Sequence, residues 1–177
     1  MGYYRKYYVE GLDDPEIYRN FLALLLAYSD AFSFIYFKYR EGERTKRSTR
    51  EIQKKLSPFK ISAKNVSQWG GTITLNESEH VYRMVTYKIE RARIFDILDV
   101  FESVKTLYDW DYPQYPMDPC FYKNGYAWFT VCSHELYNTL YLKDESSFPL
   151  ASDIESIGAK LEPDGKVAET ELFHLND

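Results

Sequence analysis

The segment from Ala31 to Tyr39 constrains the fold more than any other part of the sequence, because it is apolar on both faces of an expected strand. One face carries Phe32, Phe34 and Tyr36, and the other carries Ile35, Phe37 and Tyr39. A strand with two apolar faces needs cover on both sides, so the segment predicts a central strand of a sheet.

Asn124-Gly125 is the strongest turn signal, since this dipeptide favours the two-residue turn of a β-hairpin. It joins strand-like residues 120–123 to residues 126–132. The register of a two-residue turn then pairs Tyr122 with Ala127 and Cys120 with Phe129. Cys120 and Cys132 do not face each other in this register, so we expect two buried free thiols.

The remaining elements mix without a strict strand–helix–strand alternation. We expect further strands over 3–9, 59–66, 72–75, 80–88 and 137–143, with 72–75 and 80–88 forming a hairpin, and helices over 15–28, 48–56, 90–108 and 152–157. This order predicts an α+β fold: a mainly antiparallel sheet packed with two longer and two short helices. Residues 1–177 form a single domain in this interpretation, with an acidic tail, about 166–177, that is free to fray.

Composition narrows the class of protein. A net charge of only −5 with 45% hydrophobic residues excludes a disordered chain, and two cysteines exclude a disulfide scaffold. The N-terminal residues lack the apolar run of a signal peptide. The most hydrophobic stretch, 21–37, contains the charged Asp30, which argues against a membrane span. We therefore expect a cytoplasmic protein that does not enter a membrane.

The stretch from Tyr108 to Pro119 is the first candidate site. It combines four aromatic rings, three carboxylates and three prolines in twelve residues, and a stiff loop with aromatic anchors suits the binding of a partner protein. The residues predicted to contact the partner are Asp109, Trp110, Asp111, Tyr112, Tyr115 and Asp118. Two alternatives remain open: a structural crossover that covers the core, and a metal site at Asp109-x-Asp111.

A basic segment is the second candidate. Residues 38–64 carry ten basic and three acidic side chains, a net charge of +7, which leaves −12 on the rest of the chain. The side chains predicted to bind an anion such as a nucleic-acid phosphate are Arg44, Lys46, Arg47, Arg50 and Lys54. A solvated surface, paired with the protein's own acids or with those of another subunit, is the competing interpretation.

The third candidate is the run Cys132-Ser133-His134-Glu135, in which Cys132 and His134 are weak catalytic candidates. In an extended strand their Cβ atoms lie about 6–7 Å apart, too far for a direct hydrogen bond between nucleophile and base. Cys120, Cys132, His134 and His80 lack the paired spacing of a zinc site. The sequence therefore predicts no metal and no cofactor.

These observations favour a binding protein over an enzyme. By analogy, the compact, acidic, aromatic-rich chain resembles small bacterial or phage immunity, antitoxin and inhibitor proteins, which act by occupying a partner's surface. The alternatives are a small enzyme with a Cys/His/Asp site and a nucleic-acid-binding protein that uses residues 38–64; self-association into a homo-oligomer stays open. The leading hypothesis requires Trp110, Tyr112 and Tyr115 to face solvent.

Overall fold

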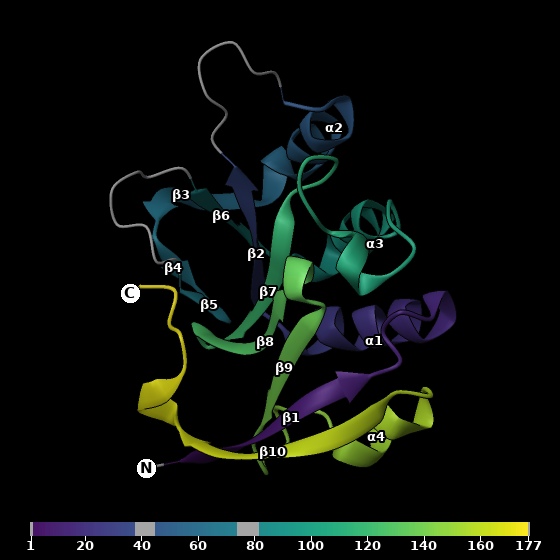
Figure 1. The fold of residues 1–177 in the computed structure, drawn as a ribbon, viewed down its shortest axis with the longest axis vertical. Coiled ribbons are helices and arrows are strands. Elements are labelled where there is room, and N and C mark those ends of the chain that lie inside the picture. Colours follow the sequence, from purple (N-terminus) through teal and green to yellow (C-terminus); the bar gives the residue numbers. More distant parts are fainter. Residues whose placement is uncertain (1, 38–44, 74–81, 177) are drawn as a thin grey trace.

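The computed structural model describes residues 2–37, 45–73 and 82–176 (Figure 1). The strands are β1 (Tyr3–Glu10), β2 (Ala31–Phe37), β3 (Lys60–Val66), β4 (Gln68–Trp69), β5 (Thr72–Ile73), β6 (Tyr82–Lys88), β7 (Met117–Lys123), β8 (Tyr126–Cys132), β9 (Tyr137–Leu142) and β10 (Lys160–Ala168). The helices are α1 (Pro15–Tyr28), α2 (Arg47–Leu56), α3 (Ile94–Phe101) and α4 (Ala151–Ser156).

One large sheet organises the molecule. Eight of the described strands form it in the order β10-β1-β9-β8-β7-β2-β6-β3, and each neighbouring pair is antiparallel. The short strands β4 and β5 pair only with each other as a separate hairpin. This arrangement confirms the predicted α+β fold with a mainly antiparallel sheet. Among the helices of the described residues, none is long and apolar enough to cross a membrane.

Helix α1 begins where its sequence predicts. The Asp14 carboxylate accepts the backbone N–H groups of Glu16 and Ile17 at 2.9 and 3.0 Å. Pro15 takes the first helical position, where a missing N–H costs nothing. The cap fixes the start of the helix so that Phe21 is fully buried against the sheet.

Helices α1, α2 and α3 cover one face of the sheet, on the right of Figure 1. Strand β2 projects Phe32 and Phe34 toward them. The Phe32 ring lies 5.1 Å from that of Phe101, and the Phe34 ring lies 4.7 Å from that of Trp110. All four side chains are buried, so this face forms a dry aromatic core.

The opposite face carries the β4–β5 hairpin and the segment that follows β10, both on the left of Figure 1. Ile35 of β2 and Met84 of β6 form a buried cluster there with Trp69 of the hairpin, and Phe173 packs against it. Strand β2 is therefore covered on both sides, as its two apolar faces predict.

The predicted helix over 90–108 is too long. Helix α3 ends at Phe101, and a separate 3₁₀ turn spans Leu107–Asp109. Thr106 and Asp109 form a capping box at the start of that turn, which offers the backbone an alternative to a continuous helix. The break lets Leu107 bury in the core from a loop.

The Asn124-Gly125 hairpin is confirmed, with positive φ angles of 51° and 83° at its two turn residues. Tyr122 pairs with Ala127 as predicted, but a register shift between Phe121 and Tyr122 then pairs Phe121 with Phe129. The predicted pairing of Cys120 with Phe129 is wrong, because the sequence does not show this bulge. Both cysteines are free and buried, as expected.

The predicted hairpin between 72–75 and 80–88 is also wrong for those of its residues that the structure describes, 72–73 and 82–88. Strand β5 pairs with β4, whereas β6 pairs with β2 and β3; residues 74–81 lie outside the described ranges. The acidic tail bridges back to the Asn-Gly hairpin, where His174 pairs with Tyr126, and its Leu172 is buried in the core.

Candidate functional site

Trp110, the central ring of the predicted partner-binding surface, is sealed inside the protein. Its side chain is 0% exposed, and its indole N–H donates to the Tyr18 hydroxyl at 2.8 Å. Phe34 and Phe101 pack against it, with ring centroids 4.7 and 5.5 Å away. The prediction that Trp110 faces solvent is therefore wrong: its one polar atom is satisfied within the core, so its large apolar area favours burial.

Asp118 is the second member of that surface withdrawn from solvent. It is 2% exposed and lies in a β-bulge of β7 with a φ of +50°. Its carboxylate accepts the Trp69 indole N–H at 2.9 Å and the Ser133 backbone N–H at 2.7 Å. Burial raises the pKa of Asp118, and these hydrogen bonds oppose the rise. The prediction that Asp118 is exposed is wrong, because the bulge turns this carboxylate inward.

The other four residues of the predicted surface differ in exposure and in contacts. Asp109 is exposed, and its carboxylate accepts two backbone N–H groups of the preceding turn. Asp111 is half-buried and accepts the backbone N–H of Tyr112. Tyr112 is 37% exposed, with its ring 4.8 Å from that of Phe37, while the half-buried Tyr115 packs against the core. Trp110 and Asp118 thus cover the core, as in the structural crossover that the sequence left open, whereas Asp109 and Tyr112 are exposed.

The predicted anion-binding side chains that the structure describes are all exposed. Helix α2 and its N-terminal flank carry exposed Lys46, Arg47, Arg50 and Lys54; Arg44 lies outside the described residues. Arg47 forms an ion pair of 2.7 Å with Glu51, so part of this charge is neutralised locally. Anion binding by the segment stays a prediction.

The Cys132–Glu135 run is not a strand. Strand β8 ends at Cys132, and Ser133–Glu135 form a 3₁₀ turn closed by a hydrogen bond of 3.1 Å from the Leu136 N–H to the Ser133 carbonyl. The turn folds His134 back, so its Nδ1 lies 3.6 Å from Sγ of Cys132. The prediction that these two groups are too far apart for a direct hydrogen bond is wrong, because it assumed extended backbone.

This turn forms one wall of a cleft of about 350 Å³, and Trp69 and Thr72 line the cleft from the hairpin. Asp118, Cys132 and His134 all line it. The structure therefore brings together one carboxylate of the first candidate site and both residues of the third, although 14 residues separate Asp118 from Cys132.

The electrostatics of this cleft do not favour a nucleophilic thiol. Burial raises the pKa of Cys132, whereas a reactive cysteine needs a lowered pKa to supply thiolate near neutral pH. The other thiol, Cys120, is sealed between the sheet and the hairpin, and burial raises its pKa to about 12. Cys132 and His134 are thus as close as the thiol and base of a cysteine-dependent enzyme, but the raised pKa of Cys132 disfavours the thiolate.

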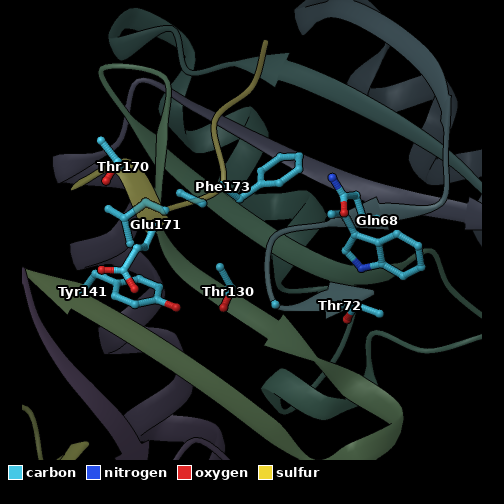
Figure 2. Close-up of a pocket in the computed structure, with 11 residues that line it drawn as sticks. Gln68, Thr72, Thr130, Tyr141, Thr170, Glu171 and Phe173 are labelled. Carbon is cyan, nitrogen blue, oxygen red and sulfur yellow. The ribbon is translucent and has the colours of Figure 1, made fainter. Parts of the chain in front are cut away.

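A larger trough of about 590 Å³ adjoins the cleft and shares the hairpin as a wall. Figure 2 shows Thr130 and Tyr141 on its floor, Gln68 and Thr72 on the hairpin side, and Thr170 to Phe173 opposite. The hairpin approaches the sheet closely at Gly70, where a Cβ atom would lie 2.7 Å from Sγ of Cys120. The trough therefore offers hydroxyl groups, one amide and the Glu171 carboxylate beside apolar side chains.

A third concavity lies where β1 ends, and we call it the acidic groove. It has a volume of about 530 Å³, and the side chains that line it include Tyr8, Glu10, Leu12, Asp13, Thr106, Tyr108, Asp109 and Leu136. Its tyrosine wall is held in place, because the Tyr108 hydroxyl accepts the Asn138 amide at 2.7 Å and the Tyr8 ring stacks on Tyr137 with centroids 5.5 Å apart.

Leu136 is the unusual member of the groove. It is 62% exposed and adopts a left-handed conformation with a φ of +53°. Such a conformation costs a residue with a Cβ atom about 1–2 kcal/mol. An exposed leucine in a strained conformation is a feature that a purely structural turn does not require, since glycine would serve there.

Sequence reasoning found Asp109 but missed Glu10, Asp13 and Leu136. The groove joins the end of β1, the 106–109 turn and the turn after β8, so no local pattern signals it. The aspartate pair 13–14 indicates only that a helix starts at Asp14, and Leu136 falls between the predicted strands 126–132 and 137–143.

Comparison with known proteins finds no matching protein family, no similar curated sequence and no similar solved structure.

Proposed function

We propose that this protein is a binding protein that holds a basic segment of a partner protein in the acidic groove. The observation that carries the proposal is the lining of the groove: three carboxylates, from Glu10, Asp13 and Asp109, share it with the rings of Tyr8 and Tyr108. Among the described residues, no lysine or arginine lines it. A lysine or arginine of a partner matches this chemistry through charge-assisted hydrogen bonds and cation–π contacts.

The carboxylates are accessible to a partner. Glu10, Asp13 and Asp109 are all exposed. Glu10 makes an ion pair of 3.4 Å with Lys160, whose side chain is itself 67% exposed. Exposed pairs of this kind contribute little to stability, so a partner's cation can replace the Lys160 ammonium at small cost.

Leu136 supplies an apolar contact beside these charges. Binding interfaces draw most of their free energy from a few apolar or aromatic anchors that become desolvated, with charges around them. An exposed leucine next to two tyrosine rings provides that anchor, and the aliphatic stem of a lysine or arginine packs well on it.

The charge distribution supports the same partner at long range. Outside residues 38–64 the chain carries a net charge of −12. An excess of one sign attracts a partner of the other sign and raises the rate of association, and salt screens the effect. We therefore expect binding to weaken as ionic strength rises.

The test is capture of the partner from the native host on three immobilised baits: wild type, Leu136→Gly/Asp13→Asn, and Phe95→Ser. Glycine suits the left-handed conformation at position 136, so the groove variant keeps its fold. Phe95 is 78% exposed on α3 and does not line the groove, so its variant controls for the loss of an exposed apolar side chain. A folded groove variant should lose a protein that both other baits retain at low salt.

The captured protein is then titrated against the three variants while backbone hydrogen exchange is measured. Protection at residues 8–13 and 106–109 on binding supports the proposal. Equal capture by all baits overturns it, as does protection confined to another surface. Self-association of the pure protein through the groove, detected by sedimentation, also overturns it, because the occupant is then a second copy.

A further inference from the structure

The 3₁₀ turn after β8 gathers three side chains of metal-binding type. Sγ of Cys132, a ring nitrogen of His134 and a carboxylate oxygen of Glu135 all lie within 4.8 Å of one another. None of the three contributes to the acidic groove, which takes Leu136 from the other end of the same turn. The cluster therefore stands apart from the proposed partner site.

The spacing of these atoms fits a tetrahedral ion. Zinc lies about 2.3 Å from a thiolate sulfur and about 2.0 Å from an imidazole nitrogen, which sets the two donors about 3.5 Å apart. Sγ of Cys132 and Nδ1 of His134 are 3.6 Å apart. The other ring nitrogen, Nε2, lies 4.0 Å from the same sulfur and 3.8 Å from Oε1 of Glu135. The side chains of His134 and Glu135 are both more than half exposed. Rotation of these exposed groups completes the set without disturbing the core.

The donors also match the ion by type. One sulfur, one nitrogen and one oxygen form a borderline-soft set that suits Zn²⁺ and excludes the hard cations Mg²⁺ and Ca²⁺, which prefer oxygen ligands only. Three ligands from one turn leave the fourth position open. All three side chains line the cleft of about 350 Å³, together with Thr72, Tyr82 and Met117. An open position in such a cleft is the arrangement of a zinc ion that can take an exogenous ligand.

Asp118 gives independent support for a cation. Its carboxylate lines the same cleft at 2% exposure, yet within the described ranges it forms no ion pair with a lysine or arginine. A buried carboxylate without a cationic partner is costly. Asp118 also holds the Ser133 N–H at 2.7 Å, so it fixes the turn that carries His134 and Glu135.

From this geometry we infer that Cys132, His134 and Glu135 bind Zn²⁺, with the open coordination position directed into the cleft and Asp118 as the positioning residue. Binding replaces the thiol proton of Cys132 with the metal, and the proton leaves to solvent. The inference does not depend on the proposed partner binding, since the two sites share no ligand or lining residue.

The test is titration of the full chain with Co²⁺ in a non-thiol reductant. The expected result is one saturable site per chain with sulfur-to-cobalt charge-transfer absorption and the visible bands of a tetrahedral ion. Zn²⁺ should abolish both by displacement. A titration without a thiolate band, or without saturation at one equivalent, overturns the inference.

Variants assign the ligands. His134→Gln and Glu135→Gln alter exposed side chains and so leave the fold intact. Each should weaken Co²⁺ binding by about tenfold or more, because removing even a group that hydrogen-bonds to a metal ligand typically costs that much. Cys132→Ser should remove the charge-transfer band. His174→Gln, Glu155→Gln and Cys120→Ala are the matched controls and should bind as wild type. Equal affinity of the ligand variants and their controls contradicts the assignment.

Asp118→Asn separates positioning from ligation. The asparagine variant should keep the charge-transfer band, because the thiolate still binds, but its affinity should fall by about tenfold. Loss of the band with a folded protein places Asp118 among the ligands and overturns this part of the inference, as does unchanged affinity.

Discussion

The two faces of the sheet are both buried, but by very different covers. Helices α1, α2 and α3 cover one face with aromatic rings such as Phe34 and Trp110 (Figure 1). The other face carries Ser33, Thr86 and Cys120 beneath a two-stranded hairpin and a tail. The helical cover is broad and interlocked, whereas the second cover is narrow.

The difference explains where two of the concavities lie, the cleft and the trough. Helices with long apolar side chains fill space to the density of a protein interior. The narrow β4–β5 cover leaves a cleft and a trough on its two sides, and both are lined by Trp69 and Thr72 of that hairpin. The free energy of unfolding should therefore depend chiefly on the helix-covered face. The proposed zinc site lies beside the hairpin-covered face.

The largest expected effect is the loss of Trp110. Trp110→Ala empties a fully buried site on the helix-covered face and removes the hydrogen bond to Tyr18. Substitutions of this kind cost about 3–5 kcal/mol in free energy of unfolding, which urea denaturation measures. Tyr112→Ala, at 37% exposure in the same loop, is the control and should cost about 1 kcal/mol or less. Similar losses of free energy of unfolding for both variants would contradict the buried position of Trp110.

A smaller loss is expected from Trp69→Phe on the hairpin side. The substitution removes the indole N–H that donates to the Asp118 carboxylate at 2.9 Å, and a charged group left with one donor fewer costs about 1–3 kcal/mol. Trp128→Phe is the matched control on the helix-covered face, because its indole donates at 2.9 Å to the neutral Ser29 hydroxyl. If Trp128→Phe is the more destabilising variant, the charge of the acceptor does not decide the cost of losing an indole donor.

Features with a local cause could be predicted from the sequence. The start of α1 follows from Asp14 and Pro15, and the Asn124-Gly125 turn needs only its own two residues. The position of β2 in the interior of the sheet follows from its two apolar faces, although the sequence does not reveal that a hairpin supplies one of the covers.

Features that depend on residues far away in the sequence could not be predicted. Trp110 is buried because Tyr18, 92 residues earlier, offers its hydroxyl. The Cys132–His134 contact needs a chain that leaves β8 in a 3₁₀ turn and a leucine that accepts a positive φ. Periodicity does not report either one, since both are set by packing of the finished fold.

A stabilising effect is expected at Thr86, which lies on β6 next to the edge strand β3. Its hydroxyl is buried and, within the described ranges, has no hydrogen-bond partner. Thr86→Val removes that unsatisfied group and keeps the shape, so thermal or urea unfolding should show a gain of about 1 kcal/mol. The control is Ser33→Ala, which should destabilise because the Ser33 and Tyr122 hydroxyls are 2.8 Å apart in a hydrogen bond. A loss of stability in Thr86→Val would mean that its hydroxyl is satisfied.

The smallest effect is a change of stability with pH at Asp118, measured with a chelator present. Burial raises its pKa above the ordinary 3.8, so the folded protein holds this proton more tightly than the unfolded chain does. Stability from this group therefore falls as pH rises from 3.8 through the raised pKa. Relative to Asp118→Asn, wild type should lose stability over that interval.

Asp164 provides the opposite sign in the same chain. The hydrogen bond and charge of Lys6 lower the pKa of Asp164, so the stability it contributes is present above the ordinary 3.8 and is lost as pH falls through the lowered pKa. Relative to Asp164→Asn, wild type should therefore gain stability as pH rises through the acid range. Opposite slopes for the two asparagine variants distinguish a carboxylate buried under the hairpin from one paired at the surface, and slopes of the same sign contradict the assignment of Asp118 to a desolvated site.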